Sequence, residues 1–187
     1  MSLRVISGTA RGRKLKSVPG DTTRPVMDRV KEALFNILAD DVIDSNWWDL
    51  FGGTGAIGIE ALSRGAASAR FSDLNRVPVE TIKENVEHCG FIKRAEIRKG
   101  DAFSMLSAQA DRKFEYIYIA PPQYHEMWVK ALKLADENIN WLTDDGTVIV
   151  QIDPTEYQEV SLKNLEETEQ RKYGSTLIIF YDRVNQP

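Results

Sequence analysis

Strand and helix patterns alternate along most of this chain, and that alternation limits the folds it can adopt. Five short apolar runs typical of buried strands occur in the sequence, and apolar residues at helical spacing lie between several of them. The strands are predicted at 47–51, 69–73, 95–98, 114–119 and 146–152. The helices are predicted from near Pro25 through Leu38, and at about 56–64, 77–89 and 125–139. Because parallel neighbours in a sheet need crossover connections, this order favours a doubly wound parallel sheet.

The two ends of the chain depart from this pattern. Residues 165–173 and 175–183 have the pattern of two strands joined at Gly174, which predicts an antiparallel edge hairpin. Near the N-terminus, residues 4–7 and 13–16 flank a glycine-containing turn, which predicts a small β-hairpin arm. The predicted fold class is therefore α/β, with a doubly wound, mostly parallel seven-stranded sheet, an antiparallel C-terminal hairpin and an N-terminal β-hairpin arm. A chain of 187 residues fits one domain, 1–187, with residues 1–20 as a basic N-terminal β-hairpin extension.

Composition narrows the class of protein further. Hydrophobic residues make up 42% and charged residues 28%, which excludes a disordered chain, a collagen-like fibre and a membrane protein. The sequence has no apolar run of transmembrane length and no segment like a signal peptide. Its one cysteine, Cys89, cannot form an internal disulfide, and no cysteines and histidines have zinc spacing. We therefore expect a cytoplasmic protein in a reducing compartment, with no metal site and no membrane partner.

The formal net charge of −4 conceals a strong asymmetry along the chain. Residues 1–31 hold eight basic and two acidic residues, a net charge of +6, so the remainder carries −10. A basic arm on an acidic body predicts a polyanionic partner bound at one end, and the alternative is a solvated, loosely ordered tail. Six basic residues are expected to meet nucleic acid: Arg4, Arg11, Arg13, Lys14, Arg24 and Arg29.

A glycine motif follows the first predicted strand. Gly53, Gly55 and Gly58 match G-x-G-x-x-G at a strand-to-helix junction, where glycines let the backbone approach a ligand and adopt positive φ. Sites for NAD share this motif, and a tight turn with packing glycines also explains it. The residues expected to bind a nucleoside cofactor are Asp49, Phe51, Gly52, Gly53, Thr54, Gly55, Asp73, Leu74, Asp101 and Ala102.

Three carboxylates in that set indicate the kind of cofactor. Asp73 ends the second strand 20 residues after Gly53, where a carboxylate can accept both ribose hydroxyls of either cofactor. Asp49 lies just before the glycine loop, where it would repel a pyrophosphate but suit the cationic amino-acid end of S-adenosylmethionine. Asp101 either meets the adenine amino group or caps a helix, or does both. Asp49 therefore favours S-adenosylmethionine over NAD.

A proline motif follows the fourth strand, at residues 120–124. Consecutive prolines cannot continue a strand ladder, so they turn the chain at the carboxyl edge of the sheet, where ligands bind in such folds. Tyr124 offers a ring that can stack on an unpaired base, although a proline turn with a core tyrosine remains an alternative. The residues expected at the catalytic site are Ala120, Pro121, Pro122, Gln123 and Tyr124.

These motifs together resemble the RsmD-like rRNA methyltransferases, which methylate guanine N2 in small-subunit rRNA. The resemblance covers nearly all of the chain. It is carried by residues 4–8 and 11–15, by 49–58 and 60–65, and most specifically by Arg24-Pro25 with residues 28–38. It implies a Rossmann-like class I methyltransferase fold, S-adenosylmethionine as cofactor, and rRNA, the small ribosomal subunit or its assembly intermediate as partner.

The sequence departs from that family in the catalytic motif. The family has Asp or Asn, then two prolines, then Tyr or Phe, whereas this chain has Ala120 at the acid or amide position and Gln123 at the aromatic position. The resemblance implies that the acid or amide and a proline carbonyl hold the target amino group. Since methyl transfer needs mostly positioning of a lone pair, the Pro121 carbonyl and the Gln123 amide can still supply acceptors.

The sequence thus predicts an enzyme that methylates an exocyclic amine of an RNA base. The first alternative is a non-catalytic RNA-binding or ribosome-assembly protein that retains the cofactor fold, and Ala120 keeps that alternative open. The second alternative is an NAD-binding oxidoreductase. It is disfavoured by Asp49, by the two prolines and by the C-terminal hairpin.

Overall fold

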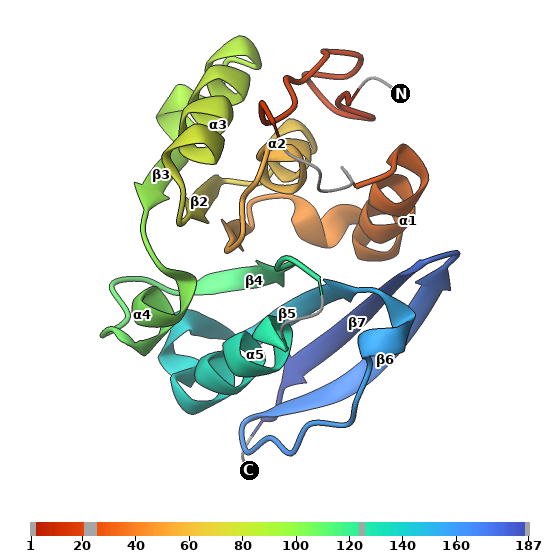
Figure 1. Ribbon diagram of the computed structural model, residues 1–187, viewed down its shortest axis with the longest axis vertical. Coiled ribbons are helices and arrows are strands. Elements are labelled where there is room, and N and C mark those ends of the chain that lie inside the picture. The colour runs from red at the N-terminus through yellow and green to blue at the C-terminus, as the bar shows by residue number, and fades with distance from the viewer. Residues whose placement is uncertain (1–2, 21–25, 124–125, 186–187) are drawn as a thin grey trace. The chain divides into compact units, whose positions relative to one another are not determined.

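The computed structural model describes residues 3–20, 26–123 and 126–185, and its chain forms two units, Met1–Gly100 and Asp101–Pro187 (Figure 1). The predicted roles of Arg24 and Tyr124 fall on residues outside the described part of the chain. The units are described in turn.

The sheet of the first unit consists of three parallel strands in the order β3-β2-β1. These strands are β1 (Asn46–Asp49), β2 (Ser68–Asp73) and β3 (Ala95–Lys99). Trp47 pairs with Ala69 and Phe71 pairs with Ile97. Trp47, Ala69 and Phe71 are buried and Ile97 is half-buried, so apolar side chains fix the register. All three predicted strands are confirmed, although the first ends at Asp49 because the next two residues already turn into the glycine loop.

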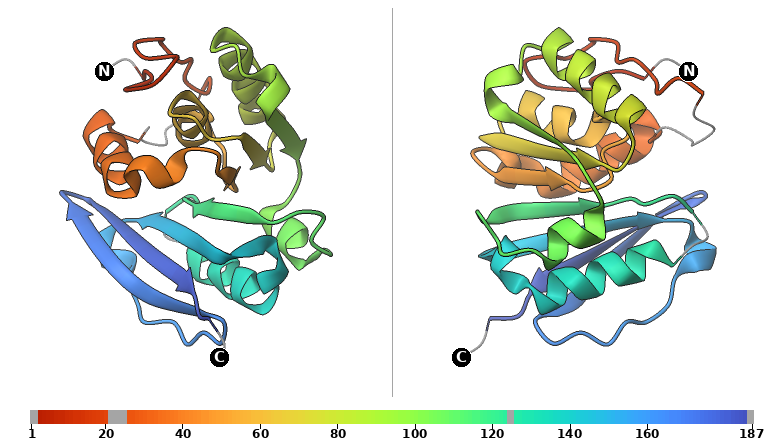
Figure 2. Two further views of the ribbon diagram at one scale, coloured as in Figure 1. Left: turned by 180° about the vertical axis from the view of Figure 1, so that it is seen from behind. Right: turned by 60° about the vertical axis from the view of Figure 1, so that its left-hand side comes forward.

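The α-helices described in the first unit are α1 (Asp28–Leu38), α2 (Ala56–Ser63) and α3 (Arg76–His88) (Figure 2). In α1 the apolar residues recur at helical spacing and face the core, where the Phe35 ring stacks on Trp47 with 5.3 Å between ring centroids. Every residue of α2 is buried, so this helix lies wholly within the unit. The helices predicted at 56–64 and 77–89 are confirmed within one residue at their ends, and the helix predicted up to Leu38 is confirmed from Asp28 onward. Its predicted start near Pro25 lies outside the described residues.

The second unit contains four strands in the order β4-β5-β7-β6. β4 (Phe114–Ile119) and β5 (Leu142–Ile152) are parallel, whereas β7 (Thr176–Arg183) is antiparallel to both β5 and β6 (Leu165–Tyr173). This confirms the predicted antiparallel C-terminal hairpin. β5 begins four residues earlier than predicted, because polar residues 143–145 interrupt its apolar pattern.

The helices of the second unit are α4 (Ala102–Ser107) and α5 (Met127–Glu137). Apolar periodicity predicted α5 but not α4, which has only six residues and too few turns to show a period. The one sequence signal for α4 was the possible N-cap at Asp101. Across the described residues the strands number seven, mostly parallel and connected by helices, so the predicted α/β fold class is confirmed. No helix in the described ranges is long and apolar enough to cross a membrane.

The N-terminal arm, residues 3–20, is a hairpin with little regular strand. One isolated antiparallel bridge pairs Arg4 with Lys14, and backbone bonds join Val5 N–H to the Arg13 carbonyl and Leu15 N–H to the Leu3 carbonyl. Leu3, Val5 and Leu15 are each less than 8% exposed. The arm is therefore packed into the first unit, and its described residues are not a solvated tail.

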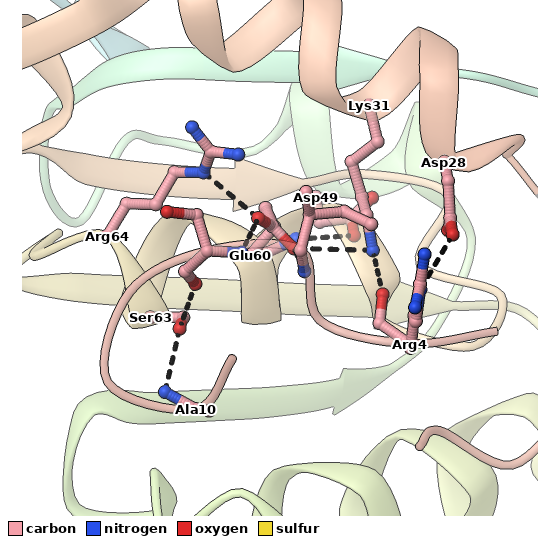
Figure 3. Close-up of polar contacts among 11 residues, drawn as sticks. Arg4, Ala10, Asp28, Lys31, Asp49, Glu60, Ser63 and Arg64 are labelled. Carbon is pink, nitrogen blue, oxygen red and sulfur yellow. Dashed lines mark hydrogen bonds and ion pairs between the residues drawn. The ribbon is translucent and has the colours of Figure 1, made fainter. Parts of the chain in front are cut away.

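One buried carboxylate anchors the arm to α2 (Figure 3). Glu60 accepts hydrogen bonds from the backbone N–H groups of Ile6 (2.9 Å) and Ser7 (3.0 Å), and its side chain has no exposed surface. It also pairs with Lys31 of α1 (3.3 Å) and with Arg64 (2.9 Å). Burial lowers the pKa of Lys31, and the Glu60 carboxylate opposes that effect.

A second contact, made by Ser63, holds the backbone of the arm close to the backbone of α2. The Ser63 hydroxyl donates to the Ser7 carbonyl (2.6 Å) and accepts from Ala10 N–H (2.9 Å). Gly8 has φ +86°, and a Cβ there would lie 1.8 Å from the Ser63 carbonyl oxygen, so only glycine fits between the arm and α2.

Replacing Glu60 with Ala should lower the free energy of unfolding by about 3–5 kcal/mol, because Lys31 and two backbone N–H groups lose a buried acceptor. Urea unfolding at neutral pH measures this, and amide hydrogen exchange at Ile6 and Ser7 should accelerate. The control is Glu87→Ala on the exposed face of α3, which should change stability by less than about 0.5 kcal/mol. Equal effects of the two substitutions would contradict the anchoring role.

Candidate functional site

The glycine loop between β1 and α2 is the best-defined part of the predicted site. Gly53 (φ +57°) and Gly55 (φ +80°) adopt left-handed backbone, which non-glycine residues rarely tolerate. A Cβ on Gly53 would meet no atom within 4 Å, so this turn faces open space on the side where a ligand can approach. The loop is fixed to β2 by the Gly52 N–H, which donates to the Ser72 carbonyl at 2.7 Å.

Gly58, the third glycine of the motif, has a different role. It lies inside α2, and a Cβ there would come within 2.3 Å of the Phe71 ring. It therefore permits close packing of the helix on β2 and does not face a ligand. The motif thus contains two turn glycines and one packing glycine.

Asp73, at the end of β2, lies against the glycine loop as predicted. Its Oδ2 accepts from Gly53 N–H (3.2 Å), and its Oδ1 accepts from Asn75 N–H (3.0 Å). Each carboxylate oxygen retains acceptor capacity, so the group can still receive two ribose hydroxyls. Leu74 is 60% exposed next to it and offers an apolar surface to a purine ring.

Asp49 is the second carboxylate next to the loop, and it is only 2% exposed. Its Oδ2 accepts from Gly58 N–H at 3.3 Å. Burial raises the pKa of Asp49 well above its ordinary value, the Gly58 N–H lowers it, and the nearby charge of Asp73 raises it further. Such a carboxyl group gains most from a ligand that brings a positive charge.

The remaining predicted cofactor residues fall in both units. Phe51, Gly52 and Thr54 lie in the loop, whereas Asp101 and Ala102 begin the second unit. Asp101 is the N-cap of α4, and its carboxylate accepts from the backbone N–H of Ser104 at 2.8 Å. The capping role of Asp101 is therefore confirmed, and its contact with adenine stays a prediction.

The proline motif follows β4 directly. Ala120 and Pro121 are half-buried, while Pro122 and Gln123 are exposed. The chain leaves the strand at Ile119, as two consecutive prolines require. The motif therefore stands at the carboxyl end of a buried strand, where the sequence predicted it.

The basic residues of the arm and of α1 divide into two groups. Arg4 pairs with Asp28 (3.0 Å), and the Arg13 guanidinium donates to the His88 carbonyl. Arg11, Lys14 and Arg29 are exposed, and within ranges 3–20, 26–123 and 126–185 they have no ion-pair partner. Those three are the cations most available to a polyanion.

Sequence reasoning did not identify Asn85 of α3, which links the arm to the glycine loop. Its Nδ2 donates to the Thr54 carbonyl (2.9 Å) and the Lys16 carbonyl (3.0 Å), and its Oδ1 accepts from Lys16 N–H (2.8 Å). Glu60 and Lys31 were missed as well. The available signal was the single acid in the otherwise apolar sequence of α2.

The described part of the chain contains no group of three or more histidines, cysteines or acids that could hold a metal ion.

Replacing Gly58 with Ala should lower the free energy of unfolding by about 1–3 kcal/mol, because the new methyl group overlaps the Phe71 ring. Adding Phe71→Leu should recover part of that loss, since the smaller side chain relieves the overlap. The control is Gly90→Ala, where φ is +77° and no atom lies within 4 Å, so its cost of about 1–2 kcal/mol should not change with Phe71→Leu. Thermal unfolding of the four variants distinguishes packing from backbone strain.

Comparison with known proteins matches this chain to one family over most of its length. Residues 3–182 match the family model described as conserved hypothetical protein 95. A Bacillus subtilis protein named as a candidate rRNA methyltransferase, YlbH, is 36% identical over 97% of this chain and 99% of its own length. The ribosomal RNA small subunit methyltransferase D of Escherichia coli K12 is 34% identical over 80% of this chain and 74% of its own.

Solved structures agree with this match. A methyltransferase candidate from Escherichia coli superposes with a TM-score of 0.86 at 31% identity and covers all of both chains. An RNA methyltransferase from Salinibacter ruber, in complex with S-adenosyl-L-homocysteine, has a TM-score of 0.67 at 16% identity over 88% of this chain and 96% of its own, which shows a common fold. The chain belongs to the RsmD-like methyltransferase family.

Proposed function

We propose that this chain transfers a methyl group from S-adenosylmethionine to an exocyclic amine of an RNA base, and that the acceptor is guanine N2 of small-subunit rRNA. Its relatives include enzymes named for the small ribosomal subunit. The observation that supports this most is the attachment of the basic arm to α2, the helix that begins at the glycine loop. A polyanion-binding surface and a nucleoside-binding loop therefore belong to one unit.

The loop residues fit S-adenosylmethionine. The free acceptor capacity of Asp73 suits two ribose hydroxyls, the open side of Gly53 admits a ligand, and buried Asp49 suits a cationic ammonium group. A pyrophosphate would gain nothing from Asp49, which disfavours NAD. S-adenosylmethionine, when bound, supplies an electrophilic methyl group on a sulfonium. The Salinibacter ruber enzyme of similar fold binds S-adenosyl-L-homocysteine, the product of that transfer.

The proline turn is where the base amine would be held. A methyl acceptor needs its nitrogen lone pair aimed at the methyl carbon, and errors of about 1 Å can cost on the order of 100-fold in rate. The Pro121 carbonyl and the exposed Gln123 amide are the acceptors proposed for this amine, and Ala120 contributes no side-chain acceptor. Tyr124, outside the described residues, is expected to stack on the base.

Ala120 favours a second candidate function, a non-catalytic RNA-binding protein of ribosome assembly that retains the cofactor fold. The two functions predict the same cofactor site and the same arm. They differ only in whether methyl groups reach RNA. We favour the enzyme, because methyl transfer needs mostly positioning of a lone pair and the Pro121 carbonyl and Gln123 amide can still supply acceptors. The partner in either case is the small ribosomal subunit or an assembly intermediate of it.

Affinity for S-adenosylmethionine should rise with pH through the raised pKa of Asp49. Below that pKa the buried carboxyl is neutral, so a cationic ligand must first displace its proton. Isothermal titration in two buffers of different ionisation enthalpy should detect proton release on binding. Asp49→Asn should abolish the release, while Asp41→Asn, at an exposed position, should preserve it. Proton release that persists in Asp49→Asn would show that another group faces the ammonium.

Neutralising Arg11 and Lys14 with Gln should weaken RNA binding and reduce its dependence on salt. Each lost phosphate contact should change the log–log slope by roughly 0.7–0.9. The control is Lys16→Gln with Lys83→Gln, which removes the same charge from residues paired with Glu84 and Glu80. A slope that is equal for wild type and both variants would contradict phosphate contacts by the arm, and affinity for S-adenosylhomocysteine should be unchanged throughout.

Wild-type protein should transfer tritiated methyl groups from S-adenosylmethionine to small ribosomal subunits that lack the modification. Gln123→Ala should slow this transfer and leave cofactor affinity unchanged, because it removes an acceptor for the base amine. Ala120→Asp should be tolerated or modestly activating. Tight cofactor binding without incorporation, restored only by Ala120→Asp, would establish the non-catalytic alternative.

A further inference from the structure

A polar cavity lies between the N-terminal arm and the outer face of α1, within the first unit. Its volume is about 430 Å³, within the range of small-ligand sites. The side chains that line it with ligand-binding groups are Arg4, Arg11, Asp28, Glu32, Asn36 and Arg64. None of them belongs to the glycine loop or to the proline turn, so this cavity is separate from the groups assigned above to the cofactor and to the methylated base.

Arg64 gives the cavity a fixed hydrogen-bond donor. Its Nε donates to Glu60, and its guanidinium carbon lies 5.1 Å from the centroid of the Phe35 ring. Only 15% of its side-chain surface is exposed. Within the described residues, no group accepts a hydrogen bond from its two Nη atoms, which point away from Glu60 (Figure 3). A fork of donors held in this way is ready for a planar acceptor pair or a phosphate.

The face of α1 that lines the cavity supplies polar groups that complement the donors of Arg64. Glu32 and Asn36 are one helical turn apart on the exposed face of the helix, and no partner for either lies in the described ranges. Asp28 already pairs with Arg4. A site for phosphate alone would not place two carboxylates in its lining, because they repel an anion. A nucleotide suits the mixture, since its base has N–H donors for Glu32 and its other polar atoms suit Arg64 and Asn36.

Charge across the unit favours RNA as the source of that nucleotide. Residues 1–100 hold sixteen basic and thirteen acidic residues, a net charge of +3, whereas residues 101–187 hold eight and fifteen, a net charge of −7. The exposed and unpaired Arg11 is also part of the cavity lining and carries the charge that a phosphate requires.

We propose that this cavity binds one unpaired nucleotide of the substrate RNA, different from the nucleotide that is methylated. Arg64 donates to acceptor atoms of the nucleotide, the Glu32 carboxylate accepts from N–H groups on the base edge, and Arg11 binds the phosphate. Base-edge contacts carry sequence information that phosphate contacts lack, so this site selects the RNA while the rest of the arm attracts it. The inference rests on the proposed RNA substrate, but it can be tested without methyl transfer.

The test titrates GMP, AMP, CMP and UMP separately into protein saturated with S-adenosylhomocysteine, which occupies the cofactor site. NMR follows the Arg64 Nε–H and the amides of Ile6, Ser7 and Gly12. At least one nucleotide should shift these signals. Its dissociation constant should be at least fivefold lower than that of inorganic phosphate. Glu32→Gln should weaken that nucleotide at least threefold and reduce the differences among the four. The control Glu87→Gln, an equal charge change on the exposed face of α3, should not.

Two outcomes would overturn the inference. Inorganic phosphate binding as tightly as every nucleotide would reduce the cavity to an anion site, and unchanged selectivity in Glu32→Gln would show that the base is not read there. Arg64→Lys provides a second variant, which keeps the charge but loses the planar fork, and it should also reduce selectivity. If wild type methylates RNA while no nucleotide shifts the signals, only this inference fails. If nucleotides bind here but no methyl transfer occurs, only the proposed activity fails.

Discussion

The first unit depends on the Glu60 carboxylate more than on any other polar group. It accepts from two backbone N–H groups of the arm and from two cationic side chains, and it is wholly buried. A buried charge is tolerated only where partners replace water, and here those partners come from the arm, from α1 and from its own helix. Lys31 is constrained in turn, because its ammonium group also donates to the Arg4 carbonyl. The ion cluster therefore fixes three segments in one arrangement.

This cluster connects the arm to the glycine loop through one helix, α2. Glu60 is the fifth residue of α2, which begins immediately after Gly55. Asn85 makes a second link, since one side chain binds both the Thr54 carbonyl of the loop and the backbone of Lys16 in the arm. Neither link relies on side chains that face solvent. RNA held by the arm would therefore be positioned against the loop by contacts that do not require the cofactor.

The sequence predicted helices and strands well wherever apolar residues recurred with a regular period over a long enough segment. In the described part of the chain, all seven strands and four of the five α-helices were predicted, because their buried faces repeat over several residues. Periodicity did not reveal α4 because it has only six residues, so the possible cap at Asp101 was its only signal. The start of β5 was missed because residues 143–145 are polar. The positions of Asp49 and Asp73 beside the loop followed from their spacing to the glycines.

Contacts between distant positions could not be read from the sequence. Glu60 meets residues 29 and 54 positions away, and Asn85 meets one 69 positions away, so no local pattern reveals these pairs. The same limit applied to the arm, where charge alone did not distinguish a docked hairpin from a solvated tail. Arg4 and Arg13 prove to be engaged within the protein, whereas Arg11 and Lys14 are not. Basic composition predicts a polyanionic partner but does not reveal which cations are free to meet one.

The charge balance around Arg64 bears on how such a partner would be recognised. Glu60 is shared by Lys31 and Arg64, so the buried cluster of three charged groups retains one net positive charge. The carboxylates of Asp28 and Glu32, on the adjacent face of α1, offset much of this remaining positive charge. Under the proposed function, long-range attraction of RNA would come from the exposed cations Arg11 and Lys14, of which Arg11 also lines the cavity. Arg64 contributes hydrogen-bond donors of fixed orientation. Its Nε donates to Glu60 and its guanidinium lies over the Phe35 ring, which leaves its two Nη groups in one plane. If both proposals hold, exposed cations of the arm would attract RNA and Arg64 would orient one nucleotide of it, so attraction and selectivity would depend on different side chains of the same unit.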